Sequence, residues 1–183
     1  MAHEPEVLRV MDTLRVSDRQ PVGEIMAVRV GWQRGISAAN QAFKALSNLA
    51  AIGKIEKHRG FFRMPGCTSD YGIHARLITQ AVSEILICYP DSVIFREHSI
   101  PIGLRPDSIC LLRQGQSAFC MVLEVMNNET QEEVERKIRA WEQWKEATSY
   151  LSSLFKVRIP HYEIITIEGG EKICAEKFPP YLE

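Results

Sequence analysis

Apolar residues recur at helical spacing in three successive segments of the first 51 residues, and this periodicity constrains the fold more than any other feature of the sequence. It predicts helices over residues 4–15, 22–30 and 38–51. Ser17 or Asp18 is suited to cap the second of these helices at its N-terminus. The N-terminal part of the chain should therefore be a small, mainly helical bundle.

The third predicted helix is followed by a short β-hairpin. Ser37 can cap the start of this helix, and Gly53 can end it. Two short strands are expected at residues 54–57 and 61–64, joined by a turn at His58, Arg59 and Gly60. The order helix, helix, turn, helix, hairpin is typical of a winged helix-turn-helix. The buried side of the third helix is expected to hold Ala39, Ala42, Phe43, Leu46, Leu49 and Ala50.

The opposite side of this helix and the hairpin carry side chains suited to nucleic acid. Asn and Gln can form bidentate hydrogen bonds with adenine, and Lys can reach guanine or a phosphate. Cations on a wing suit phosphates or a minor groove. The alternative is a winged helix that mediates protein interaction or dimerisation through an ordinary solvated face. The DNA-binding hypothesis predicts contacts with duplex DNA from Asn40, Gln41, Lys44, Ser47, Asn48, Lys54, Lys57, His58, Arg59 and Arg63.

The charge is distributed unevenly along the chain. Residues 1–65 carry ten Lys or Arg and six Asp or Glu, a balance of +4, whereas residues 66–183 carry twelve and seventeen, a balance of −5. Such an asymmetry indicates two parts with different partners, the basic part facing a polyanion. A chance distribution is the alternative.

The remainder of the chain predicts a second, mixed domain. The turn-rich segment 65–72 favours a division into a winged helix-turn-helix at residues 1–66 and a second domain at residues 70–183. The apolar run 119–123 is typical of a strand covered on both faces. The fold class expected for the whole chain is therefore α+β. The second domain should contain helices at residues 73–88 and 131–150 and strands at 92–96, 108–112, 118–125 and 162–167.

Two acidic residues could converge at one edge of this sheet. Asp107 precedes one predicted strand, and Glu124 lies near the end of the next. Two carboxylates in such a position can hold Mg²⁺, which stabilises the charge that develops on a phosphodiester. The alternative is structural, with a turn aspartate after Pro106 and a solvated glutamate at a strand end.

Here the chain resembles the PD-(D/E)XK nuclease superfamily. Pro106-Asp107 stands at the PD position and Glu124 at the second acidic position, so the resemblance implies that both would be metal ligands. Glu84 matches a glutamate that many members place on the preceding helix. The lysine two residues after the second acid is replaced by Met126, which cannot orient or deprotonate a water. Lys137, on the following helix, is the candidate to replace it.

The overall layout also resembles the replication-relaxation family of plasmid and mobile-element proteins. That resemblance rests on the winged helix, Arg105-Pro106-Asp107, Glu124 with the turn at residues 127–130, and Lys137. It implies a role in the replication, relaxation or transfer of a plasmid or transposon. Because Met126 replaces the motif lysine, we expect a DNA-binding protein with a restriction-endonuclease-like, inactive C-terminal domain. The alternatives are an Mg²⁺-dependent DNA endonuclease using Asp107, Glu124, Lys137 and Glu84, and a transcriptional regulator with a C-terminal interaction domain. A second copy of the chain, or replication and transfer proteins, would be further partners.

The compartment is predicted from the cysteines and the hydropathy. The five cysteines are Cys67, Cys88, Cys110, Cys120 and Cys174, and their scattered spacing indicates neither a disulfide framework nor a zinc site. Cys88, Cys110 and Cys120 lie in apolar runs and are expected to be buried thiols. No stretch approaches the roughly 18 to 20 apolar residues that span a bilayer, and the N-terminus has no signal-peptide pattern. We therefore expect a cytoplasmic protein without a membrane partner.

Overall fold

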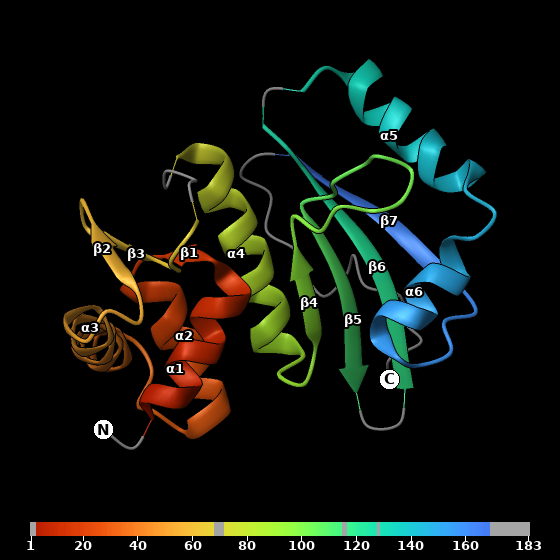
Figure 1. Cartoon of the computed structure of the whole chain (residues 1–183). Helices are drawn as coiled ribbons and strands as arrows, with labels where there is room; N and C mark the ends of the chain where they lie inside the picture. Colours follow the sequence, from red (N-terminus) through yellow and green to blue (C-terminus); the bar gives the residue numbers. More distant parts are fainter. Residues whose placement is uncertain (1–2, 68–71, 115–116, 128, 169–183) are drawn as a thin grey trace. The chain divides into compact units, whose positions relative to one another are not determined.

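The computed structural model describes residues 3–67, 72–114, 117–127 and 129–168. Over these ranges the fold is α+β, with six helices, a three-stranded antiparallel sheet and a four-stranded mixed sheet (Figure 1). The chain divides into two compact units, Met1–Pro90 and Asp91–Glu183, called the first and second unit below. The expected fold class is confirmed at this level, and each unit is described by itself.

The first unit contains the three predicted N-terminal helices and the predicted hairpin, in the predicted order. Its sheet has the order β1-β3-β2, with both pairings antiparallel. The strand β1 was not predicted, because a two-residue strand has no periodicity to detect. The elements are α1 (Glu4–Leu14), β1 (Val16–Ser17), α2 (Arg19–Val30), α3 (Ile36–Ala51), β2 (Glu56–His58), β3 (Phe61–Arg63) and α4 (Ile73–Cys88).

Caps and turns in the first unit follow local chemistry in part. Asp18 caps α2, and its carboxylate accepts a hydrogen bond of 2.7 Å from the backbone nitrogen of Gln20. Ser37 was expected to cap α3, but the helix already begins at Ile36, after Gly35 at φ 77°. The hairpin loop consists of Arg59 and Gly60, both with positive φ, as tight two-residue hairpin turns require.

Helices α2 and α3 approach each other closely at Gly23. A Cβ atom added at Gly23 would lie 2.8 Å from the carbonyl carbon of Ala38 and from the backbone nitrogen of Ala39. Only a residue without a side chain permits this contact between the two backbones. The adjoining core is closed by fully buried residues of the three helices: Val7, Val10, Met11, Leu14, Ile25, Met26 and Leu46.

Helix α4 belongs to the first unit, whereas the sequence placed it after a boundary at residues 66–70. It packs on α2, and the Thr79 hydroxyl donates a buried hydrogen bond of 3.0 Å to the Val16 carbonyl oxygen. The structure divides the chain between Pro90 and Asp91 instead. The physical reason is the apolar side of α4, with Ile78, Val82 and Ile85 fully buried.

The second unit is a four-stranded sheet with two helices. The strand order is β4-β5-β6-β7, antiparallel except for the parallel pair β6 and β7. Residues 120–125 of β6 are all buried, as expected for a strand covered on both faces. The elements are β4 (Val93–Arg96), β5 (Ser108–Gln114), β6 (Ser117–Met126), α5 (Gln131–Gln143), α6 (Ala147–Phe155) and β7 (Tyr162–Glu168).

One predicted helix, at residues 131–150, is two helices in the structure. Trp144 leaves the helical conformation with ψ 94°, and its ring lies 5.6 Å from that of Trp141 and 5.1 Å from that of Tyr150. Trp141 of α5 and Leu151 and Phe155 of α6 belong to one core cluster with residues of β5 and β6, and Figure 1 shows α6 in front of the sheet. The prediction of one continuous helix was wrong, because the aromatic cluster of Trp141, Trp144 and Tyr150 favours a bend at Trp144.

The cysteines and the hydropathy agree only partly with the sequence-based expectations. Cys110 and Cys120 are buried, and burial raises the pKa of the Cys120 thiol to about 12. Cys88 is exposed, so its predicted burial was wrong: it occupies the last residue of α4. Cys174 lies outside the described residues. Within the described ranges, no helix has the length and apolar character needed to cross a bilayer.

Candidate functional site

The outward side of α3 presents polar and cationic side chains. Asn40, Gln41, Lys44 and Asn48 are exposed, on the side opposite the buried Ala42, Leu46 and Leu49. Ser47 differs from the prediction, because its hydroxyl oxygen is buried and has no hydrogen-bond partner among the described residues.

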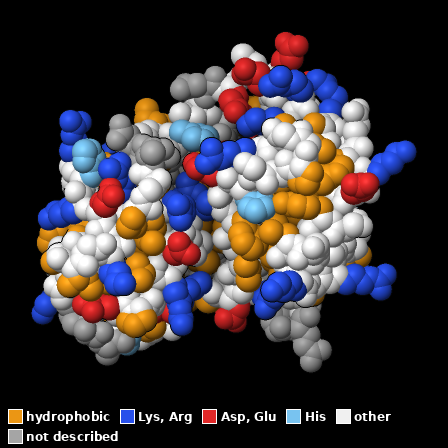
Figure 2. Space-filling view, viewed as in Figure 1, with side chains coloured by type: hydrophobic (Ala, Val, Ile, Leu, Met, Phe, Trp, Pro, Cys, Tyr) orange, Lys and Arg blue, Asp and Glu red, His pale blue; other side chains and the backbone are white. Residues whose placement is uncertain are grey.

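The hairpin β2–β3 adds cations beside α3. Lys54, Lys57 and Arg59 are exposed, while His58 and Arg63 are half-buried. Arg63 is neutralised in part by an ion pair of 2.7 Å with Glu56. Figure 2 shows Lys and Arg side chains along the edge of the first unit that α3 and the hairpin form in Figure 1.

Three of these cations lack an anionic partner. Among the residues that the structure describes, Lys44, Lys54 and Arg59 form no ion pair and no side-chain hydrogen bond. Asn40 accepts a long hydrogen bond of 3.4 Å from Arg19, and Asn48 donates one of 3.3 Å to Glu4. These side chains are held weakly and can reorient toward a ligand without losing strong interactions.

The second unit brings three of the four predicted catalytic residues together. Asp107 immediately precedes β5, and the pairing of Ser108 with Leu123 places it level with Glu124 on β6. The Nζ atom of Lys137, on α5, lies 3.0 Å from a carboxylate oxygen of Glu124. Lys137, the candidate to replace the motif lysine, therefore contacts Glu124. Glu84 lies on α4, in the first unit, where it accepts a hydrogen bond from Gln80.

Glu129 is a second partner of Lys137 that sequence analysis did not assign. Its carboxylate lies 2.8 Å from the Lys137 Nζ. The signal that could have found it is an acidic residue just before the capping box in which Thr130 and Glu133 start α5. Partial burial lowers the pKa of Lys137, but its hydrogen bonds to Glu129 and Glu124 outweigh that effect and raise the pKa above its ordinary value.

Burial dominates the electrostatics of Glu124. The residue is 1% exposed, and desolvation raises its pKa from 4.5 to about 7 despite the hydrogen bond from Lys137. The nearby charges of Asp107 and Glu129 raise it further. A carboxyl with such a pKa exchanges a proton near neutral pH, yet it lies beneath α5 rather than at an open surface.

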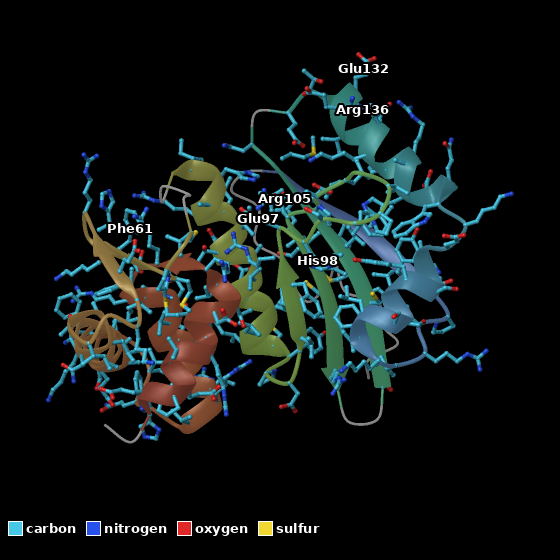
Figure 3. All side chains as sticks on the ribbon, in the orientation of Figure 1. Phe61, Glu97, His98, Arg105, Glu132 and Arg136 are labelled. Atoms are coloured by element: carbon cyan, nitrogen blue, oxygen red, sulfur yellow. The ribbon has the colours of Figure 1, made fainter. Side chains whose placement is uncertain are left out.

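The Asp107 side chain is hydrogen-bonded to the backbone of the neighbouring strand. Its carboxylate accepts a buried hydrogen bond of 2.7 Å from the backbone nitrogen of Val125. Arg105, two residues earlier, forms an ion pair of 2.8 Å with Glu97, and both are labelled in Figure 3. Asp107 therefore connects β5 to β6 at the level where Glu124 meets Lys137.

The cluster of Asp107, Glu124 and Lys137 differs from a binding site for Mg²⁺ in the ligands it offers. Mg²⁺ requires octahedral oxygen ligation, usually with several waters. In the described part of the chain no group of three or more His, Cys, Asp or Glu could hold a metal ion. One oxygen of Glu124 is taken by Lys137 and one of Asp107 by a backbone amide. In this arrangement the residues do not fit Mg²⁺.

Comparison with known proteins adds no relative. No family model matches the chain. No curated protein and no solved structure matches it either.

Proposed function

We propose that the first unit binds double-stranded DNA as a winged helix-turn-helix, with α3 in the major groove and the β2–β3 hairpin as the wing. The observation that carries the proposal is the outward side of α3, where Asn40, Gln41 and Lys44 are exposed beside the unpaired cations of the hairpin. Amide side chains suit base edges, and unpaired cations suit phosphates.

The order of the elements supports this proposal. A strand between the first two helices pairs with β3, so the hairpin is fixed to the helical bundle beside α3. The hairpin loop presents Arg59 at its tip with φ 41°. A rigid attachment keeps the cations in place before binding, which lowers the entropy cost of association.

The test is a binding titration of a labelled random-sequence duplex at several salt concentrations. Lys44→Ala combined with Arg59→Ala should weaken binding and make the dependence on salt shallower, because each lost phosphate contact reduces the slope by about one. The matched control is Lys145→Ala with Arg158→Ala, which removes the same charges from exposed positions of the second unit. Equal affinity and slope for wild type and the first variant would contradict the proposal.

For the second unit we propose a nuclease-like domain that does not cleave DNA. The support is the engagement of its acidic pair, with Glu124 buried under Lys137 and Asp107 bonded to the Val125 amide. We propose that the DNA is that of a plasmid or mobile element, and the support for this is the sequence resemblance to the replication-relaxation family alone.

The competing function is an Mg²⁺-dependent endonuclease, which the convergence of Asp107, Glu124 and Lys137 favours. Purified protein is incubated with supercoiled plasmid and Mg²⁺ or Mn²⁺, and wild type is compared with Asp107→Ala. A shifted but uncut plasmid in both cases supports the non-cleaving domain. Nicking that disappears in the variant would establish the nuclease instead.

A further inference from the structure

Two large apolar side chains lie exposed on α3. Phe43 was expected in the core, but it is 40% exposed, and Ile36 is 82% exposed. Seven positions are nearly two helical turns, so both lie on one side of α3, with Asn40 between them. Their exposure leaves both side chains available for contact with a ligand.

Phe43 borders a groove between α3, the start of α2 and the hairpin. The groove has a volume of about 440 Å³ and is lined by Asp18, Arg19, Gln20, Phe43, Gly60 and Phe62. The Phe43 ring packs edge-on against Phe62 at 6.1 Å between centroids. The Phe43 side chain remains 40% exposed despite this contact.

Two cations lie over the Phe43 ring. The Arg19 guanidinium lies 5.8 Å and the Lys57 ammonium 5.1 Å from the Phe43 centroid. The one carboxylate of the groove, Asp18, caps α2 and bonds to its backbone. An apolar side chain with cations beside it is complementary to the major groove. There the apolar methyl group of thymine lies between the two negatively charged phosphate backbones.

We infer that Phe43, together with Ile36, contacts the 5-methyl group of thymine, so that the first unit prefers A·T base pairs. The thymine methyl is the apolar group that distinguishes base pairs in the major groove. Asn40 and Gln41 extend the same preference, since their amides pair with adenine. Arg19 and Lys57 contact the flanking phosphates. This inference rests on the proposed binding of duplex DNA.

The test removes only the methyl group. A duplex is selected by the full-length wild-type protein from a pool with a randomised centre, labelled with fluorescein, and remade with deoxyuridine in place of every thymine. Wild type should bind the thymine duplex about fourfold more tightly for each buried methyl. Phe43→Ala should reduce this preference toward one, and Phe43→Leu should retain part of it.

Controls separate the possible outcomes. Ile102→Ala removes a side chain of similar exposure, 38%, from the second unit and should keep the wild-type preference. Circular dichroism checks that Phe43→Ala remains folded. Equal binding of the thymine and deoxyuridine duplexes by wild type, or an unchanged preference in Phe43→Ala, would overturn the inference while duplex binding stands. Failure of the wild type to select or bind any duplex would overturn the proposed function itself.

Discussion

Replacing Glu124 by Gln should change how the stability of the second unit depends on pH. Glu124 is 1% exposed, and its pKa is raised to about 7 in the folded chain, mainly by burial. The unfolded chain releases this proton near 4.5, so between the two values the folded state holds more protons than the unfolded state. The free energy of unfolding contributed by this group therefore falls as the pH rises through that window.

The magnitude follows from the two pKa values. A rise from 4.5 to about 7 corresponds to roughly 3 kcal/mol in total, of which roughly 2 to 3 kcal/mol is lost between pH 5 and pH 8. Glu124→Gln removes the ionisable group but keeps an oxygen that can accept from Lys137. The free energy of unfolding of Glu124→Gln minus that of wild type has some value at pH 5. This difference should increase by roughly 2 to 3 kcal/mol between pH 5 and pH 8.

Denaturant unfolding at pH 5, 6, 7 and 8 measures this difference. In a Trp32→Phe background, the fluorescence of the remaining Trp141 and Trp144 reports on the second unit alone. Glu135→Gln, which replaces an exposed acid of α5, should follow the wild-type curve. Parallel curves for Glu124→Gln and wild type from pH 5 to pH 8 would refute the reasoning.

Two further substitutions test the packing and capping of the units. Gly23→Ala should lower the stability of the first unit by about 1–3 kcal/mol, because the new Cβ would lie 2.8 Å from backbone atoms of α3, although Ala favours helices by about 1 kcal/mol. Thermal unfolding followed by circular dichroism measures this, and an unchanged or higher melting temperature would contradict the close approach. Thr130→Ala should cost the second unit about 1 kcal/mol, because it removes the side chain that accepts from the Glu133 amide at 3.3 Å. Thr130→Ser retains the oxygen and should unfold at the wild-type denaturant concentration; a similar loss in both variants would exclude the cap as the cause.

Much of the local structure could be predicted from the sequence. The helices of the first unit follow from apolar spacing, and the hairpin turn follows from Gly60 between two short strands. Both depend on interactions between neighbours in the chain, which the sequence displays directly. The break between α5 and α6 was missed because it depends on the packing of Trp144 against Tyr150, a contact that periodicity does not reveal.

The candidate residues show the same division. Asn40, Gln41 and Lys44 could be placed on the outer side of α3 because helical spacing fixes which residues share a side. Phe43 was predicted on the buried side of α3, at the margin of that side. Only the packing of the hairpin residue Phe62 against it decides how much of its ring is exposed. Lys137 was a candidate from its position, but its distance to Glu124 depends on how α5 crosses the sheet.

The sequence by itself determined the order and type of most elements, the concentration of positive charge in residues 1–65, and the residue types available for binding. The tertiary structure alone decided that α4 joins the first unit, that β1 fixes the hairpin to the helices, and that Lys137 lies between Glu124 and Glu129. The reason is physical: periodicity shows which side of an element is apolar, but it does not show which distant segment covers that side. Contacts between residues far apart in the chain are settled only when the whole core is packed.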